Sequence, residues 1–217
     1  MDVRSSEVTI PIGEVGLAAD LVLPDDPVGV VLFAHGSGSS RHSPRNTAVA
    51  RVLNRQALGT VLVDLLTPAE EQVDLRTAEL RFDIGLLSDR LAAIVDWLIE
   101  EPSTRGLPIG LFGASTGAAA ALVCAAYRPE QVRAVVSRGG RPDLAGPSLA
   151  GVRAPTLLLV GGLDEEVIAL NEQARRALLG QVELHVVPGA THLFEEPGKL
   201  DQVADEAASW FATHLRR

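Results

Sequence analysis

The sequence predicts an α/β fold in which a mostly parallel sheet is covered by helices on both faces. Two observations support this prediction. Short apolar segments alternate with segments whose apolar residues recur at helical spacing, as in repeated strand–helix units. Several of the short segments are apolar without interruption, which is typical of strands that are buried on both faces of a sheet.

The first predicted elements form a hairpin. EVTIPI (7–12) and GLAADLVLP (16–24) are separated by a glycine-containing turn, and we expect them to pair as antiparallel strands. VGVVLFAHG (28–36) is a continuous apolar run, as in a fully buried strand, and it ends in a His-Gly pair. A helix over 44–57 and a strand over 60–65 are expected to follow it.

The alternation continues to the end of the sequence. The remaining predicted elements are helices over 86–99, 115–127, 166–178 and 198–215 and strands over 108–113, 132–140, 154–162 and 182–189. Two connections are expected to be loops: the polar segment 66–84 and the Gly/Pro-rich segment 139–153. Long loops in a compact domain are often functional, although ordinary surface loops are an equal alternative here.

The composition is that of one globular domain, which we expect to span residues 1–217. The hydrophobic fraction is 47%, the charged fraction is 22%, and the formal net charge is −9, which argues against a nucleic-acid surface. The single cysteine excludes an internal disulfide and fits a reducing cytoplasm. We find neither a signal peptide nor an apolar run of about 18 residues, so we expect a cytoplasmic protein without a membrane span, as a monomer or homodimer.

Ser115 lies in the pattern Gly113-Ala-Ser-Thr-Gly117, between a predicted strand and an alanine-rich predicted helix. A G-x-S-x-G pattern at such a junction is typical of a nucleophilic serine in a strained turn, where the neighbouring residues must be small. The alternative is a tight turn in which Ser115 only caps the helix. The pattern alone leaves both interpretations open.

A serine hydroxyl needs a base, and His192 is the best of the five histidines. It follows the predicted strand 182–189, so it should lie at the same sheet edge as Ser115, where the carboxyl ends of parallel strands meet. His35, at the end of a buried strand, is expected to bond loop backbone beneath the site instead.

Asp164 directly follows the predicted strand 154–162, so we expect it to orient His192. Glu165 and Glu166 are competitors that better suit a first helical turn, and Asp143 is a weaker alternative. The resulting chain order is serine, acid, histidine, which is the order of the α/β-hydrolase type of triad.

The oxyanion hole is expected from the backbone N–H groups of Thr116, the residue after the nucleophile, and of Ser37 in the Gly/Ser-rich loop after the third strand. Gly38 and Ser39 are alternatives to Ser37. The same loop is a weak candidate for phosphate binding, because no Gly-Lys-Ser/Thr or G-x-G-x-x-G pattern accompanies it.

Other reactive residues have simpler expected roles. Cys124 is expected to be buried in the helix, and no metal-ligand spacing is present, so we expect neither metal nor cofactor. Arg41 and Arg138 lie near predicted strand ends. We expect them on the surface, and reception of an acidic substrate group is the alternative.

The segments FAHGSGSSRHSPRN, LFGASTGAAAAL, LLLVGGLDEEV and VPGATHLFEEPGKL resemble the α/β-hydrolase superfamily, and within it the small dienelactone-hydrolase-like proteins. The resemblance covers about residues 8–212. It implies a sheet of about eight strands, the second antiparallel to the others, without a large cap domain, and it assigns the nucleophile to Ser115, the acid to Asp164 and the base to His192. Dienelactone hydrolase itself uses a cysteine nucleophile, so Ser115 favours a general carboxylesterase.

The expected function is therefore serine hydrolysis of small carboxylic esters through an acyl-enzyme. A thioesterase, a lactonase or a dienelactone-type hydrolase would use the same residues. A ligand-binding receptor or regulator on a hydrolase fold is the alternative outside enzymes. Similar modules are also found fused to phosphoribosyltransferase domains, and we expect no such domain within residues 1–217.

Overall fold

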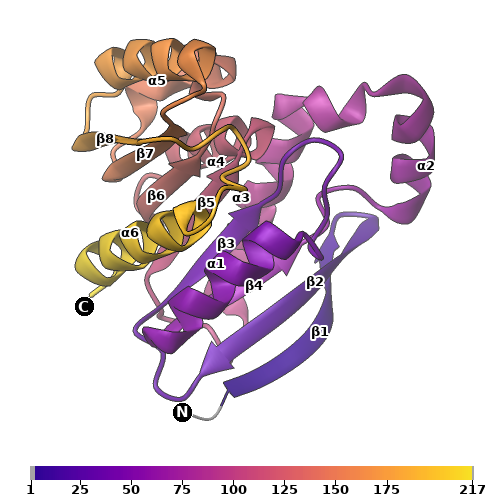
Figure 1. Cartoon of the computed structure of the whole chain (residues 1–217). Helices are drawn as coiled ribbons and strands as arrows, with labels where there is room; N and C mark the ends of the chain where they lie inside the picture. The colour runs from indigo at the N-terminus through magenta and orange to yellow at the C-terminus, as the bar shows by residue number, and fades with distance from the viewer. Residues whose placement is uncertain (1–2, 217) are drawn as a thin grey trace.

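The computed structural model describes residues 3–216, which form an eight-stranded sheet with helices on both faces (Figure 1). The strand order is β1-β2-β4-β3-β5-β6-β7-β8. The strands are β1 (Val3–Ile12), β2 (Val15–Pro24), β3 (Gly29–Ala34), β4 (Leu58–Val63), β5 (Ile109–Ala114), β6 (Val132–Arg138), β7 (Thr156–Gly161) and β8 (Val182–Val187). The predicted sheet is confirmed, and no large cap is present within the described residues.

The hairpin and the parallel core differ in strand direction. β1 pairs antiparallel with β2, and β2 pairs antiparallel with β4, so β2 alone opposes the other strands of the described sheet. From β4 through β3 to β8 every pairing is parallel. All carboxyl ends of these parallel strands therefore meet at one sheet edge, and the loops after them can build one site.

Side chains of the central strands alternate between two apolar clusters, one on each face of the sheet. In β3, Val30 and Leu32 belong to one cluster and Val31 and Phe33 to the other, and all four are buried. The first cluster is covered by α3 (Ile84–Glu100), α4 (Thr116–Tyr127) and α5 (Glu165–Ala177), and the second by α1 (Pro44–Arg55) and α6 (Lys199–His214). Burial on both sides explains the unbroken apolar runs in the sequence.

The segment 66–84 is not the loop that the sequence analysis predicted. It contains the helix α2 (Pro68–Thr77) and the short 3₁₀ helix η1 (Leu80–Phe82). The only buried residue of α2 is Asp74, so this helix has no apolar stripe by which periodicity could detect it. Its local signals are the capping box of Thr67 and Glu70 and a proline at its first position.

The Gly/Pro-rich segment 139–153 also contains helical structure. Most of it is the 3₁₀ segment η2 (Pro142–Gly151), which is interrupted at Gly146, where φ is 52°. Among residues 3–216, no helix is long and apolar enough to cross a membrane.

Candidate active site

Ser115 lies in the turn between β5 and α4, with φ of 51° and ψ of −122°. A positive φ is uncommon for a residue with a side chain, and such conformations cost about 1–3 kcal/mol, which the surrounding structure must hold in place. The Ser115 side chain makes no capping hydrogen bond to α4. Its hydroxyl, on a partly exposed residue, is therefore not engaged in the helix-capping role that the sequence left open.

Glycines allow the turn at Ser115 to pack this closely. A Cβ atom at Gly113 would lie 2.4 Å from the Cα of Ala118, and a Cβ atom at Gly117 would lie 2.3 Å from the carbonyl oxygen of Ala34. Both distances are far inside van der Waals contact. The small residues of the sequence pattern are thus required by backbone packing between β3, β5 and α4.

His192 and Asp164 are joined by a hydrogen bond of 2.6 Å between His192 Nδ1 and Asp164 Oδ2. A carboxylate only accepts hydrogen bonds, so Nδ1 carries the proton and Nε2 of a neutral imidazole remains a free acceptor. Asp164 precedes α5, yet its side chain makes no capping bond to that helix. Its carboxylate is instead committed to the histidine.

The loops that carry Asp164 and His192 meet through close backbone contact. A Cβ atom at Gly161, at the end of β7, would lie 2.4 Å from the carbonyl oxygen of Thr191. The N–H of Leu163 also donates to the carbonyl of Ala190 at 2.9 Å. The end of β7 and the loop after β8 are therefore fixed against each other, which brings the acid and the base together.

Ser115 and His192 both lie against the end of β6. The backbone N–H of Ser115 donates to the carbonyl of Arg138 at 3.2 Å, and a Cβ atom at Gly139 would lie 3.6 Å from His192 Cε1. No hydrogen bond joins the Ser115 hydroxyl to His192 among residues 3–216. Such a bond commonly tightens only when substrate binds.

His35 holds the loop after β3 from beneath, as the sequence analysis expected. Its Nε2 accepts the backbone N–H of Leu65 at 3.1 Å, so the proton lies on Nδ1, which donates to the carbonyl of Gly36 at 3.0 Å. Burial lowers the pKa of His35, which keeps the imidazole in the neutral form that these two bonds need.

The three candidate donors in this loop are in different states. The N–H of Ser37 donates to Thr116 Oγ1 at 2.9 Å, and the N–H of Ser39 donates to the carbonyl of Gly36 at 3.2 Å. The N–H of Gly38 makes no hydrogen bond within the described residues. The structure thus brings Ser37 and Thr116 together, but through the Thr116 side chain.

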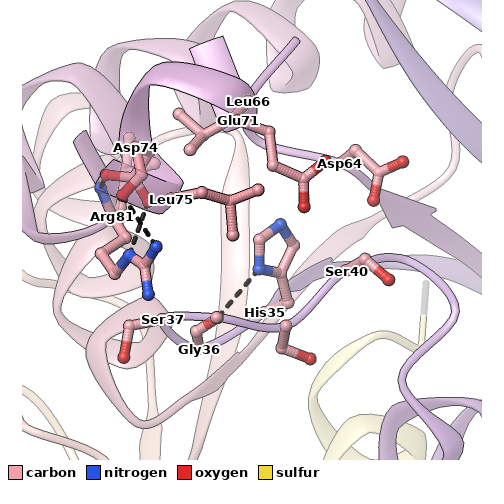
Figure 2. A pocket seen from close by; sticks show the side chains of 13 residues that line it. His35, Gly36, Ser37, Ser40, Asp64, Leu66, Glu71, Asp74, Leu75 and Arg81 are labelled. Carbon is pink, nitrogen blue, oxygen red and sulfur yellow. Dashed lines mark hydrogen bonds and ion pairs between the residues drawn. The ribbon is translucent and has the colours of Figure 1, made fainter. Parts of the chain in front are cut away.

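A cavity of about 220 Å³ lies between this loop and the segment of α2 and η1 (Figure 2). Leu66, Leu75 and Leu87 give it an apolar part, and Arg81 is held beside it by Asp74, with 3.0 Å between the backbone N of Arg81 and Asp74 Oδ1. The misassigned loop 66–84 therefore supplies one wall of a cavity next to the candidate oxyanion hole.

The two arginines at the strand ends are not surface residues, so that expectation is wrong. The Arg41 side chain is 12% exposed and contacts three carboxylates, those of Glu7, Asp20 and Asp64. Its charge is compensated within the protein, which leaves little for an acidic substrate group.

Arg138 is only 8% exposed, and its Nη1 has no hydrogen-bond partner in the described structure. Its guanidinium lies 6.0 Å from the centre of the Phe112 ring. Burial, together with the charge of Arg45, lowers the pKa of Arg138 to about 10. Periodicity assigned Arg138 to a strand end but gave no sign that its side chain is buried.

Asp143, Glu165 and Glu166, the other acidic candidates, do not contact His192. Asp143 pairs with Arg141, at 2.8 Å between Arg141 Nη2 and Asp143 Oδ2, and the two glutamates occupy the first turn of α5. Cys124 is buried in α4, and burial raises the pKa of its thiol to about 12. Within residues 3–216, no three His, Cys, Asp or Glu side chains gather in a way that could hold a metal ion.

The geometry agrees with comparisons to known proteins. Residues 48–214 match the family described as the dienelactone hydrolase family. The chain belongs to the dienelactone hydrolase family. Its structure is similar to that of a dienelactone hydrolase from Anabaena variabilis, with a TM-score of 0.97 and 57% sequence identity over 99% of both chains. Membership of this family supports a hydrolase.

Two other comparisons extend the picture. The fold of Est1E from Butyrivibrio proteoclasticus is similar, with a TM-score of 0.77 over 96% of this chain and 98% of that one, at 15% identity, which shows the fold alone. A Mycobacterium tuberculosis protein provisionally named a phosphoribosyl transferase is 57% identical over 98% of this chain. This chain spans 47% of that relative, so about half of its length.

Proposed function

We propose that this protein is a serine hydrolase that cleaves small carboxylic esters through an acyl-enzyme on Ser115, with residues 1–217 acting as one catalytic domain. The observation that carries the proposal is the Asp164–His192 hydrogen bond beside a serine with a positive φ and an uncapped hydroxyl. Membership of a hydrolase family supports the same chemistry. The proposed acid, base and nucleophile are Asp164, His192 and Ser115.

The proposed reaction uses the free lone pair on His192 Nε2. Ser115 Oγ attacks the ester carbonyl carbon while its proton moves to His192, and Asp164 stabilises the imidazolium that forms. The carbonyl π electrons become an oxyanion beside the N-terminus of α4, where the N–H of Thr116 is a donor. Collapse of this intermediate breaks the bond to the alcohol oxygen, which takes the proton from His192. Water then releases the acid by the same steps.

The cavity beside the Ser37 loop favours a small substrate. Its volume of about 220 Å³ suits a short acyl or alcohol group rather than a large one. An ester is preferred over a dienelactone because the nucleophile position holds Ser115 rather than a cysteine. Thioesters and lactones would be attacked by the same residues and belong in the same substrate panel.

The name phosphoribosyl transferase belongs to a relative of about twice this length. We propose hydrolysis rather than phosphoribosyl transfer for the matched part, because the family match itself covers residues 48–214. A reducing cytoplasm, which fits the single cysteine, is the proposed location, and a monomer or homodimer the proposed state.

The test compares wild type with Ser115→Ala, using Ser103→Ala as a control on an exposed serine after α3. A fluorophosphonate probe should label wild type and Ser103→Ala, and mass spectrometry should locate the adduct on Ser115. Hydrolysis of p-nitrophenyl acetate and butyrate should vanish only in Ser115→Ala. Undiminished turnover by Ser115→Ala would overturn the proposal, and ligand binding without turnover across esters, thioesters and lactones would favour a receptor.

A further inference from the structure

The residue after the proposed nucleophile has a side chain in an unusual position. Thr116 Oγ1 accepts the backbone N–H of Ser37 at 2.9 Å, across 79 positions of sequence. Thr116 is 5% exposed and begins α4, and Ser37 lies in the loop after β3. The two backbone N–H groups expected to form the oxyanion hole are therefore linked by a threonine hydroxyl.

The peptide between Gly36 and Ser37 is fixed at both ends. Its carbonyl accepts Nδ1–H of His35 at 3.0 Å and the N–H of Ser39 at 3.2 Å, while its N–H donates to Thr116. A peptide unit is planar, so its carbonyl and N–H reorient together. Turning the Ser37 N–H toward an oxyanion would disturb the bonds to its carbonyl.

The hydroxyl of Thr116 has an unused proton. A threonine hydroxyl donates one hydrogen bond and accepts up to two, and the Ser37 N–H occupies an acceptor position. Within residues 3–216, no acceptor receives a hydrogen bond from Thr116 Oγ1. A threonine inside a helix often donates to the carbonyl four residues earlier, but here that residue, Phe112, belongs to β5.

We propose that the Thr116 hydroxyl is itself a catalytic donor of the oxyanion hole. This inference rests on the proposed function. The oxyanion formed when Ser115 Oγ attacks the carbonyl accepts two hydrogen bonds from Thr116, one from its backbone N–H and one from Oγ1–H. Ser37 does not touch the oxyanion, and its N–H polarises the hydroxyl, since a hydrogen bond accepted by a hydroxyl strengthens the one it donates.

Other than hydrogen bonds, no bond of Thr116 is made or broken. As the carbonyl re-forms and the alcohol leaves, the electron pair returns from the oxyanion to carbon and both hydrogen bonds weaken. The competing arrangement is that the Thr116 side chain rotates away and the Ser37 N–H takes the oxyanion. The two arrangements predict opposite effects of removing the hydroxyl.

The test uses Thr116→Val, which keeps the branched shape, and Thr116→Ser, which keeps the hydroxyl. With p-nitrophenyl acetate, kcat of Thr116→Val should fall about 10- to 100-fold, toward the loss seen when one oxyanion donor is removed, with KM changed less than about threefold. Thr116→Ser should stay within about fivefold of wild type. Thr116→Ala, which fits any space, replaces Thr116→Val if that variant does not fold, and it should show the same loss.

Outcomes separate this inference from the proposed function. Wild-type kcat or higher in Thr116→Val, with Ser115→Ala inactive, would overturn the hydroxyl donor and leave the serine mechanism standing. A loss in Thr116→Ser as large as in Thr116→Val would also overturn it, since the hydroxyl would not be the determinant. A wild-type protein that neither hydrolyses the ester nor reacts with the fluorophosphonate would overturn both.

Discussion

Two regions on either side of the Ser37 loop are held together in different ways. Around Ser115, backbone packs on backbone, and glycines at positions 113, 117 and 161 leave no room for a Cβ atom. The segment of α2 and η1 is instead held by side chains, chiefly the pairs Arg90–Glu70 and Arg81–Asp74. The first region should be intolerant of added atoms, and the second should be sensitive to charge and pH.

The largest expected effect comes from adding one methyl group near Ser115. In Gly117→Ala the new Cβ atom would lie 2.3 Å from the carbonyl oxygen of Ala34 and 2.5 Å from that of His35. Neither backbone oxygen can move away cheaply, so we expect a loss of about 3 kcal/mol or more in the free energy of unfolding, measured by urea denaturation.

Gly85→Ala is the matched control for this substitution. Gly85 lies in the first turn of α3, next to the segment of α2 and η1, and its new Cβ atom would meet only the flexible side chain of Asp83, at 3.3 Å. Stability should stay within about 1 kcal/mol of wild type, because alanine is the better helix former. Equal losses in both variants would contradict the contrast between the two regions.

Asp164→Asn should affect activity more than stability. The asparagine keeps the shape but no longer holds the Nδ1 proton of His192, so we expect kcat for p-nitrophenyl acetate to fall by about 10²- to 10⁴-fold. Asp143→Asn tests the competing acid, since Asp143 pairs with Arg141 and not with His192. Activity should survive in that control, and the reverse pattern would reassign the acid.

Glu70→Gln tests the side-chain pairs of the second region. Glu70 accepts from Arg90 at 2.8 Å between Oε2 and Nη1, and the Arg90 side chain is 7% exposed, so the change leaves a largely buried guanidinium without its counter-ion. Because Glu70 itself is partly exposed, we expect a loss of about 1–3 kcal/mol at pH 7, below that of a fully buried pair. Turnover per folded molecule should be nearly unchanged.

The same variant predicts a pH dependence. The bond to Arg90 lowers the pKa of Glu70 from 4.5 to about 2. A carboxyl whose pKa is lower in the folded state stabilises the protein above pH 4.5, and this contribution is lost as pH falls toward 2. The stability difference between wild type and Glu70→Gln should therefore shrink between pH 4.5 and 2, and a constant difference over that range would contradict the assignment.

The sequence by itself determined the alternation of strands and helices and the order of Ser115, Asp164 and His192. Both follow from local pattern, because strands buried on two faces must be apolar throughout and residues after parallel strands share one edge. It missed α2, whose only buried residue is the charged Asp74, because apolar periodicity cannot mark a helix that buries no apolar stripe.

Only the tertiary structure decided what individual polar groups contact. It showed that the Ser115 side chain does not cap α4, that Arg138 is buried, and that the Ser37 N–H is bonded to Thr116. These facts depend on atoms that are far apart in sequence, as with the 79 positions between Ser37 and Thr116. Hydrogen bonds have short range and strict direction, so a local pattern can bring such residues to one edge but cannot choose their partners.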